Sequence, residues 1–531
     1  MKKNFFLLNQ KFILLFFLSV GTLLYLTAIN FFANFPGDNL DARFNHFVLE
    51  YFYGVLIGKN ESFINGNFFY NLPNTMNLSD NHWLLAPFYA LIRLLGFNEF
   101  LSYQIWVYLG FLANFLVCFY VFKKFKFNLL SCAIGAYLFS FNQINFAKIS
   151  HIQLNFKIFI ILGIWYFKRY IDTNNFKYAS YIFLCVVLQL MCNCYTGNFF
   201  MLFLFFMILV YFGGYKIYEF KQIIPKRWDC KISIPIFILS ILILIFWSYP
   251  YYQTLRIYNL TNPRVIIGSF VFSDFFSFLN HPILDYLIKT FDLNFLKKHY
   301  ENSLFIGFIP WIMLLYFFLN KKLLKSLNKF EKILLKSTFF FIVFFLIEKH
   351  FYSFTILQIC IKSFTNLRAY PRFFYVIFFV FIYIFTFVIN KFTFQNNWRY
   401  LQILILILAV FEPFIPKNNY ALVQKINLEY QNIKDKFSDK KLAKDSILYY
   451  TSKEKNDMGK LINIQINMMF LANELGVKTI NGYSSYFPLY LTSSKNCDDL
   501  QNNIDYNEKI VTRITKKEFK YDSKKIITYC D

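Results

Sequence analysis

Long apolar segments alternate with short polar ones along most of this chain. A hydrocarbon core of about 30 Å needs roughly 20 apolar residues per helix. By that measure we predict about eleven transmembrane spans, at 12–32, 100–122, 129–147, 154–170, 177–192, 197–214, 233–251, 303–319, 334–347, 371–389 and 400–416. The first span follows Lys2, Lys3 and Lys11 but is too long for a signal peptide and lacks a small-residue cleavage site. We therefore expect an uncleaved anchor.

Two long loops, 33–99 and 252–302, interrupt this alternation. Within the first loop, residues 45–58 and 82–96 carry apolar side chains at helical spacing and each closes near a glycine. The pattern predicts two amphipathic helices lying in the plane of the membrane surface. Asp38 or Asp41 is placed to cap the first helix and Asp80 to cap the second.

The chain changes character near residue 417. The pattern predicts short strands at 446–450, 478–482, 510–514 and 525–530, and an amphipathic helix at 461–476 closed by a glycine. We therefore predict an all-α, polytopic membrane domain over 1–416, followed by a small extracytoplasmic α/β domain over 417–531. Cys497 and Cys530 both fall in this last region, where a disulfide is one alternative in an oxidising compartment.

Composition and charge support the membrane class. The chain is 57% hydrophobic and 23% aromatic, with a net charge of +25. Its lysines and arginines gather in every second loop, at 123–126, 168–177, 216–231 and 321–332, which is the pattern of cytoplasmic loops. We therefore expect a multi-pass protein of a bacterial inner (cytoplasmic) membrane, with a cytoplasmic N-terminus and a periplasmic or extracellular C-terminal domain. The basic charge then reports topology and contact with membrane lipids, and no nucleic-acid partner is expected.

The acids are distributed differently. The first loop with its flanks holds Asp38, Asp41, Glu50, Glu61, Asp80 and Glu99, whereas from Phe100 to Pro250 the only acids are Asp172, Glu219 and Asp229. Transporters generally need ionisable groups inside the helix bundle. Acids concentrated in the first loop instead indicate work at the outer membrane surface.

Two motifs are candidates for chemistry. In GDNLDARFN, Asp38 and Asp41 can act as helix caps, and one of them can also act as general base on a hydroxyl. In RAYPRFF, Arg368 and Arg372 flank Pro371, which suits the first turn of a helix. Arginines at a helix N-terminus are suited to clamp a phosphate, although snorkelling to lipid headgroups explains them equally well.

Weaker candidates complete the set. His151, in HIQLN, lies at an external span edge and can line a sugar site or make contacts between helices. Asp80 and Glu301 are further candidates for substrate binding. His46 and His82 lie near acids in the first loop, but their spacing matches no standard metal site. A divalent ion is an alternative that this pattern does not support, and we expect no metal or cofactor.

The order of these features resembles the GT-C fold of membrane glycosyltransferases. LDARF resembles the acidic–Ala–Arg–aromatic motif of the aminoarabinose- and mannosyl-transferase branches, with Leu40 at the motif's first acidic position, which leaves the choice between Asp38 and Asp41 open. The nearer likeness is to YfhO-like bacterial membrane proteins. It rests on GDNLDARFNHFVLEY, FFYN with SDNHWLLAPFYALIRLLG, HIQLNFK, RAYPRFF and GYSSYFP.

The resemblance implies transfer of a sugar from a polyprenyl-phosphate donor to a glycan or lipid acceptor of the cell envelope. Asp41 or Asp38 would be the base, and Arg368 and Arg372 would bind the donor phosphate. The alternatives are a non-catalytic scaffold of the same fold and a transporter or flippase of lipid-linked glycans.

Overall fold

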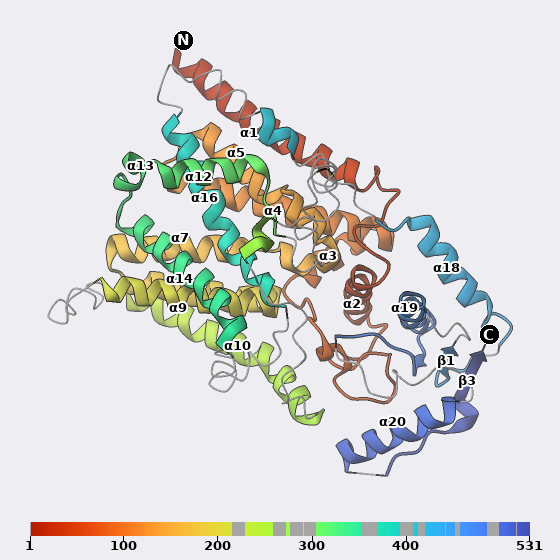
Figure 1. Ribbon diagram of the computed structural model, residues 1–531. Coiled ribbons are helices and arrows are strands. Elements are labelled where there is room, and N and C mark those ends of the chain that lie inside the picture. Colours follow the sequence, from red (N-terminus) through yellow and green to blue (C-terminus); the bar gives the residue numbers. More distant parts are fainter. Residues whose placement is uncertain are drawn as a thin grey trace.

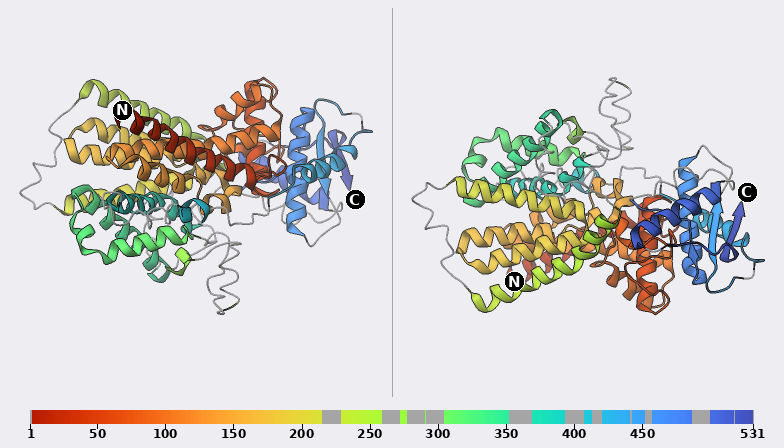
Figure 2. Two further views of the ribbon diagram at one scale, coloured as in Figure 1. Left: turned by 90° about the horizontal axis from the view of Figure 1, so that it is seen from above. Right: turned by 90° about the horizontal axis from the view of Figure 1, so that it is seen from below.

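The computed structural model describes residues 2–214, 229–258, 272–276, 290, 304–351, 369–392, 407–412, 420–440, 442–451, 457–485, 499–516 and 518–530. The chain is mostly helical, with one small parallel sheet near its C-terminus (Figure 1). A bundle of helices occupies one side of the molecule, and the C-terminal elements lie at its far end (Figure 2).

The bundle contains helices long enough to cross a membrane. It consists of α1 (Lys2–Ala28), α4 (Glu99–Lys124), α5 (Leu129–Ser140), α7 (Ile158–Thr173), α8 (Phe176–Cys192), α9 (Cys194–Gly213), α10 (Cys230–Ile257), α12 (Phe308–Leu319), the short α13 (Lys321–Lys325), α14 (Lys329–Phe351) and α16 (Phe374–Phe392). Among the described residues, six apolar segments reach spanning length: Lys11–Ala28, Glu99–Lys124, Ile149–Thr173, Cys194–Gly213, Cys230–Ile257 and Tyr370–Lys391. These helices indicate a multi-pass membrane protein. The finer count of eleven stays a prediction, in part because 400–416 is described only at 407–412.

One predicted span, 129–147, is divided. α5 ends at Ser140, and the chain continues as the short α6 (Gln143–Ala147) and the 3-10 helix η2 (Ile149–Asn155). Asn142 caps α6 through the backbone N–H of Ile144, while the Asn145 amide donates to the carbonyls of Phe139 and Ser140. Polar side chains that bond the backbone locally compete with the helix ladder. They satisfy the backbone of this buried turn.

Asparagine begins many of the helices. Asn98, Asn128, Asn175 and Asn193 accept backbone N–H groups at the starts of α4, α5, α8 and α9. Each such bond satisfies one of the donors that a helix start leaves free. At these four helices an asparagine thus marks the start.

The two helices of the first loop differ from the prediction and from each other. α2 (Asp41–Leu56) is buried over most of its surface, so the prediction of an interfacial helix is wrong for it. α3 (Ala86–Leu94) does present an apolar face, with Phe88, Leu91 and Leu94 more than half exposed. Such a face is typical of a helix that lies in a membrane surface.

The C-terminal region contains α18 (Val423–Asp435), β1 (Ile447–Thr451), α19 (Met458–Leu475), β2 (Lys478–Thr479), α20 (Asp499–Thr515) and β3 (Ile526–Cys530). β1 lies at the centre of a parallel sheet of order β2-β1-β3, with Ile447 opposite both Lys478 and Ile526. Three predicted strands are therefore present, and α19 agrees with the predicted helix. The strand predicted at 510–514 is wrong, because these residues belong to α20.

The C-terminal region shares a hydrophobic core with the first loop. Phe47 of α2 and Phe68 pack in one cluster with Ile447, Met469 and Phe470. Alternate residues of β1 face a second cluster on the other side of the sheet, which includes Leu448, Tyr450, Met468 and Leu471. One of these two clusters therefore extends into the first loop, while the other consists of C-terminal residues alone.

Candidate functional site

Asp41 lies where three distant segments meet. It is the first residue of α2, and its carboxylate Oδ1 accepts a hydrogen bond of 2.6 Å from the Tyr483 hydroxyl. Its Oδ2 lies 3.7 Å from Nε2 of His151, which comes from η2. The Asp41 side chain is 39% exposed, so a substrate hydroxyl can reach it. Of the candidates from the sequence, Asp41 and His151 are brought together.

Asp38 serves the backbone. Its Oδ1 accepts the N–H groups of Leu40 and Ala42, each at 3.0 Å, and its own N–H donates to Oγ of Ser150. Gly37 before it has φ +110°, and a Cβ there would lie 2.5 Å from Cβ of Ala42. Leu40 occupies the N-cap position, so neither aspartate is the N-cap residue, but Asp38 serves the first turn of α2 through the N–H of Ala42. Asp41 is left with its carboxylate turned to other side chains.

A buried layer continues from Asp41 along α2. Asn45, one turn later, donates to the Ser150 carbonyl and lies 2.9 Å from Nε2 of His82. His82 is buried, and burial lowers its pKa to about 4, while the Asp80 carboxylate opposes that shift. A neutral His82 that donates from Nε2 to Oδ1 of Asn45 fits this geometry. Segment 79–82 is thereby attached to α2.

Asp80 and Arg372 occupy the other end of this segment. Oδ2 of Asp80 accepts a 2.7 Å bond from the Asn193 amide, and Oδ1 accepts the backbone N–H of Cys194 at 3.5 Å. Asp80 therefore contacts the start of α9. The prediction that it caps α3 is wrong, because α3 begins at Ala86 and its N-cap residue is Leu85. The Arg372 guanidinium lies 4.6 Å from the centre of the Tyr195 ring, beside the same helix start. Pro371 stands in the first turn before α16, as predicted.

Three further predictions cannot be placed. Arg368 and Glu301 lie outside the described residues, as does Cys497 of the predicted disulfide alternative. The structure thus joins Asp80 and Arg372 through the start of α9. Asn45, one turn after Asp41 on α2, contacts His82 of the segment that carries Asp80.

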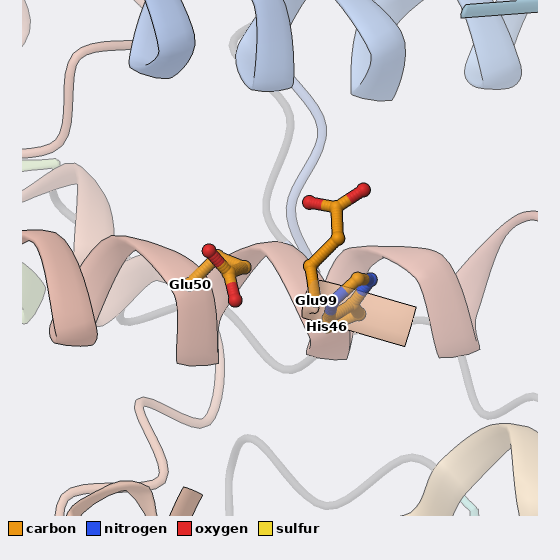
Figure 3. Close-up of side chains that lie close together, drawn as sticks. All are labelled: His46, Glu50 and Glu99. Atoms are coloured by element: carbon orange, nitrogen blue, oxygen red, sulfur yellow. The ribbon is translucent and has the colours of Figure 1, made fainter. Parts of the chain in front are cut away.

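A second polar cluster lies between α2 and the start of α4, apart from the candidate base. His46 and Glu50 come from successive turns of α2, and Glu99 comes from the start of α4 (Figure 3). One ligand atom from each lies within 4.8 Å of the others. His and carboxylate groups at such distances suit a metal ion, so the surrounding charges decide the interpretation.

Arginines neutralise this cluster. Nε of Arg93 lies 2.7 Å from Glu50, and Arg43 lies 3.7 Å from Glu99 and 2.6 Å from Nδ1 of His46. Burial lowers the pKa of His46, and the nearby arginines lower it further. Burial raises the pKa of Glu50, and Glu99 adds to the effect. Two cations and two carboxylates balance each other, so the cluster is better described as a buried ion-pair network than as a cation site.

This network connects the first loop to the C-terminal region. The Arg43 guanidinium lies 3.7 Å from the centre of the Phe470 ring of α19, a cation–π contact. The only signal of this ion-pair network in the sequence is the helical spacing of Arg43, His46 and Glu50, which places these residues on one face of α2.

Tyr483 is the partner that sequence reasoning missed. It belongs to GYSSYFP, where the backbone N–H of Gly482 donates to Oε1 of Gln465 and that of Tyr483 contacts the sulfur of Met469. The next residues reach segment 79–82, since the hydroxyls of Ser79 and Ser485 lie 2.9 Å apart. α19 thus positions Tyr483 over Asp41. Only the family-like motif pointed to this stretch.

No protein-family model matches this chain, and a search of curated proteins found no match. The likeness to GT-C glycosyltransferases rests on the sequence motifs quoted above.

Proposed function

We propose that this chain is a membrane glycosyltransferase that moves a sugar from a polyprenyl-phosphate donor to a hydroxyl of a cell-surface glycan or lipid, on the outer face of the membrane. The observation that carries the proposal is the partly exposed Asp41 carboxylate, fixed between Tyr483 and His151. Asp38 is the less suitable base because its carboxylate accepts two backbone N–H groups.

In this reaction Asp41 takes the proton of the acceptor hydroxyl as its oxygen bonds to the anomeric carbon. The bond from that carbon to the phosphate oxygen breaks at the same time, and the polyprenyl phosphate leaves as an anion. Tyr483 donates to Oδ1 of Asp41 and leaves Oδ2 to receive the proton. His151, 3.7 Å from Oδ2, is placed to contact the acceptor hydroxyl or to take up the proton afterwards.

Charge develops on the departing phosphate, and cations stabilise it. Arg372 supplies one, held beside the start of α9 by its contact with Tyr195. Arg368 is proposed as the second. The backbone N–H groups of Cys194 and Thr196 at the start of α9 already bond Asp80 and Asn193, so the proposal assigns the phosphate charge to the arginines alone. Asp80, which accepts from Asn193 and Cys194 there, fixes this helix start against segment 79–82.

The proposal is tested with the purified chain in liposomes that contain synthetic polyprenyl-phosphate hexoses labelled in the sugar. Release of label from the lipid, to an acceptor or to water, measures cleavage of the donor. We expect Asp41→Asn to lower the rate by on the order of a hundredfold or more. Asp172→Asn, in the last turn of α7, is the matched control and should keep the parental rate.

Three outcomes would overturn the proposal. No turnover of any donor in the presence of envelope lipids would favour a scaffold. Movement of intact donor between the leaflets without cleavage would favour a flippase. Unchanged turnover by a folded Asp41→Asn variant would remove the proposed base.

A further inference from the structure

A polar cavity separates α18 from α19 in the C-terminal region. Its volume is about 310 Å³, at the lower end of the range of roughly 300–1,000 Å³ that small-molecule sites occupy. Its lining consists of Glu429, Asn432, Ile433, Lys460, Leu461, Asn463, Ile464 and Asn467. Five of these eight residues offer an amide, a carboxylate or an ammonium group from the two helices.

The polar groups of the cavity form a relay that ends without a partner. Asn463 donates to Oε2 of Glu429 at 2.6 Å, and Asn467 donates to Oδ1 of Asn463 at 3.1 Å. Asn467 is 1% exposed, and its own Oδ1 has no hydrogen-bond donor among the described residues. A buried acceptor without a donor costs about 1–3 kcal/mol. Because solvent does not reach this oxygen, Asn463 and Glu429 are the members of the relay that a ligand in the cavity can contact.

The charges favour a neutral ligand over a phosphate. Glu429 and Lys460 bring one charge of each sign to the cavity wall. The start of α19 is already occupied, because Oδ1 of Asp457 accepts the N–H groups of Gly459 and Lys460. Amides and a carboxylate together provide both donors and acceptors, which is what adjacent hydroxyl groups on a sugar ring require.

The cavity is also attached to the loop that holds the candidate base. The Asn39 amide donates to Oε2 of Glu429 at 2.7 Å, and Asn39 lies between Asp38 and Asp41 in sequence. α19 therefore carries the cavity wall through Asn463 and Asn467, and holds Tyr483 through Gln465 and Met469.

We propose that the cavity between α18 and α19 binds a neutral saccharide unit of the acceptor, away from the point of transfer. The role as acceptor site rests on the proposed glycosyl transfer, whereas saccharide binding by this cavity does not. The ligand is recognised by hydroxyl contacts to Glu429, Asn432 and Asn463, with Leu461 and Ile464 beside its apolar ring face.

The test uses the full chain in detergent and saturation-transfer NMR with four neutral trisaccharides as probes: maltotriose, cellotriose, mannotriose and chitotriose. We expect at least one to bind. Asn432→Trp, which fills the cavity from an exposed position of α18, should weaken that binding at least tenfold. Asn427→Trp is the matched control, since Asn427 is exposed on the same helix but does not line the cavity.

A second variant keeps the test independent of folding. Asn467→Leu removes the unsatisfied acceptor, so the melting temperature should stay the same or rise. It also removes the amide that donates to Asn463, so binding should weaken because Asn463 is no longer held in place. Binding of none of the probes, equal binding by Asn432→Trp, or competition by 10 millimolar inorganic phosphate would each overturn the proposal. Asp41→Asn separates the two proposals, because it should abolish transfer and leave probe binding unchanged.

Discussion

Tyr483 and Asp41 are 442 positions apart in sequence, and the tyrosine hydroxyl donates to the aspartate carboxylate at 2.6 Å. This bond makes the C-terminal region part of the candidate site. It also gives the two aspartates of GDNLDARFN different surroundings, since Asp38 bonds backbone and Asp41 bonds side chains.

The first prediction concerns Tyr483→Phe. A hydrogen bond to a charged group contributes about 1.5–3 kcal/mol, so its loss should lower the rate of donor cleavage on the order of tenfold, with little change in KM. Tyr249→Phe, at a half-exposed ring, is the control. Steady-state kinetics of both variants check this, and equal rates would show that Tyr483 does not position the base.

The second prediction concerns Asp38. Because its carboxylate accepts two backbone N–H groups at the start of α2, Asp38→Ala should lower the free energy of unfolding by about 1 kcal/mol. Activity per folded molecule should persist. Thermal unfolding in detergent, combined with activity normalised to folded protein, gives both quantities. A folded Asp38→Ala variant without activity would transfer the role of base to Asp38.

The third prediction concerns the buried ion pairs of α2. Arg93→Met leaves the buried Glu50 carboxylate without its cation, and should destabilise the protein on the order of 3 kcal/mol. Glu50→Gln should cost less, because Arg93 lies nearer the surface and can turn to water. Unfolding of the two variants under the same conditions provides the measurement. The reverse order of stabilities would contradict the described network.

The fourth prediction concerns pH. Burial lowers the pKa of His82 to about 4, against an ordinary value of 6.5. His82 is therefore neutral in the folded protein, whereas in the unfolded chain it takes up a proton below about pH 6.5. The free energy of unfolding that depends on His82 is therefore greatest above pH 6.5 and falls as the pH falls towards 4. Over this range the free energy of unfolding should fall by about 3 kcal/mol. His46, with its pKa lowered by burial, acts in the same direction.

Melting temperatures measured between pH 4 and 7.5 check this dependence. His82→Gln keeps a donor for Asn45 and does not titrate, so its melting temperature should fall less steeply below pH 6.5 than that of the parent. Parallel curves for the two proteins would show that His82 gains its proton without cost.

The bundle and the C-terminal sheet could be read from local patterns, because their determinants are local. The predicted span 100–122 lies within α4, and the strand prediction 446–450 overlaps β1. The strand prediction at 510–514 was wrong because Ile510 and Val511 are residue types that favour strands. Ile504 and Val511, two helical turns apart, are buried on one face of α20, and that longer period decides the structure.

The site was only partly predictable. Asp41 and His151 were identified by residue type and by motif. Their contact depends on the 3-10 helix η2, which carries His151 and which the pattern of spans did not predict. Asp80 was assigned to a cap by its position before an apolar run, whereas its bonds go to α9 across 113 positions. Contacts of that range arise from the packed fold, and no local spacing records them.

The last prediction concerns the C-terminal region as a separate piece. Its sheet and α19 pack Ile447, Met469 and Phe470 against Phe47 and Phe68 of the first loop. A fragment of residues 417–531 alone would expose this apolar face and lose the cation–π contact between Arg43 and Phe470. Large exposed apolar patches lead to aggregation or loss of structure. We therefore expect the fragment to be degraded by protease, while the same region resists cleavage in the full chain.

In the full chain, Phe470→Ala should cost about 3–5 kcal/mol and make the region sensitive as well. Phe519→Ala, which removes a partly buried ring at the edge of the same cluster, is the control and should cost less. A protease-resistant isolated fragment would instead show that the C-terminal region folds on a core of its own.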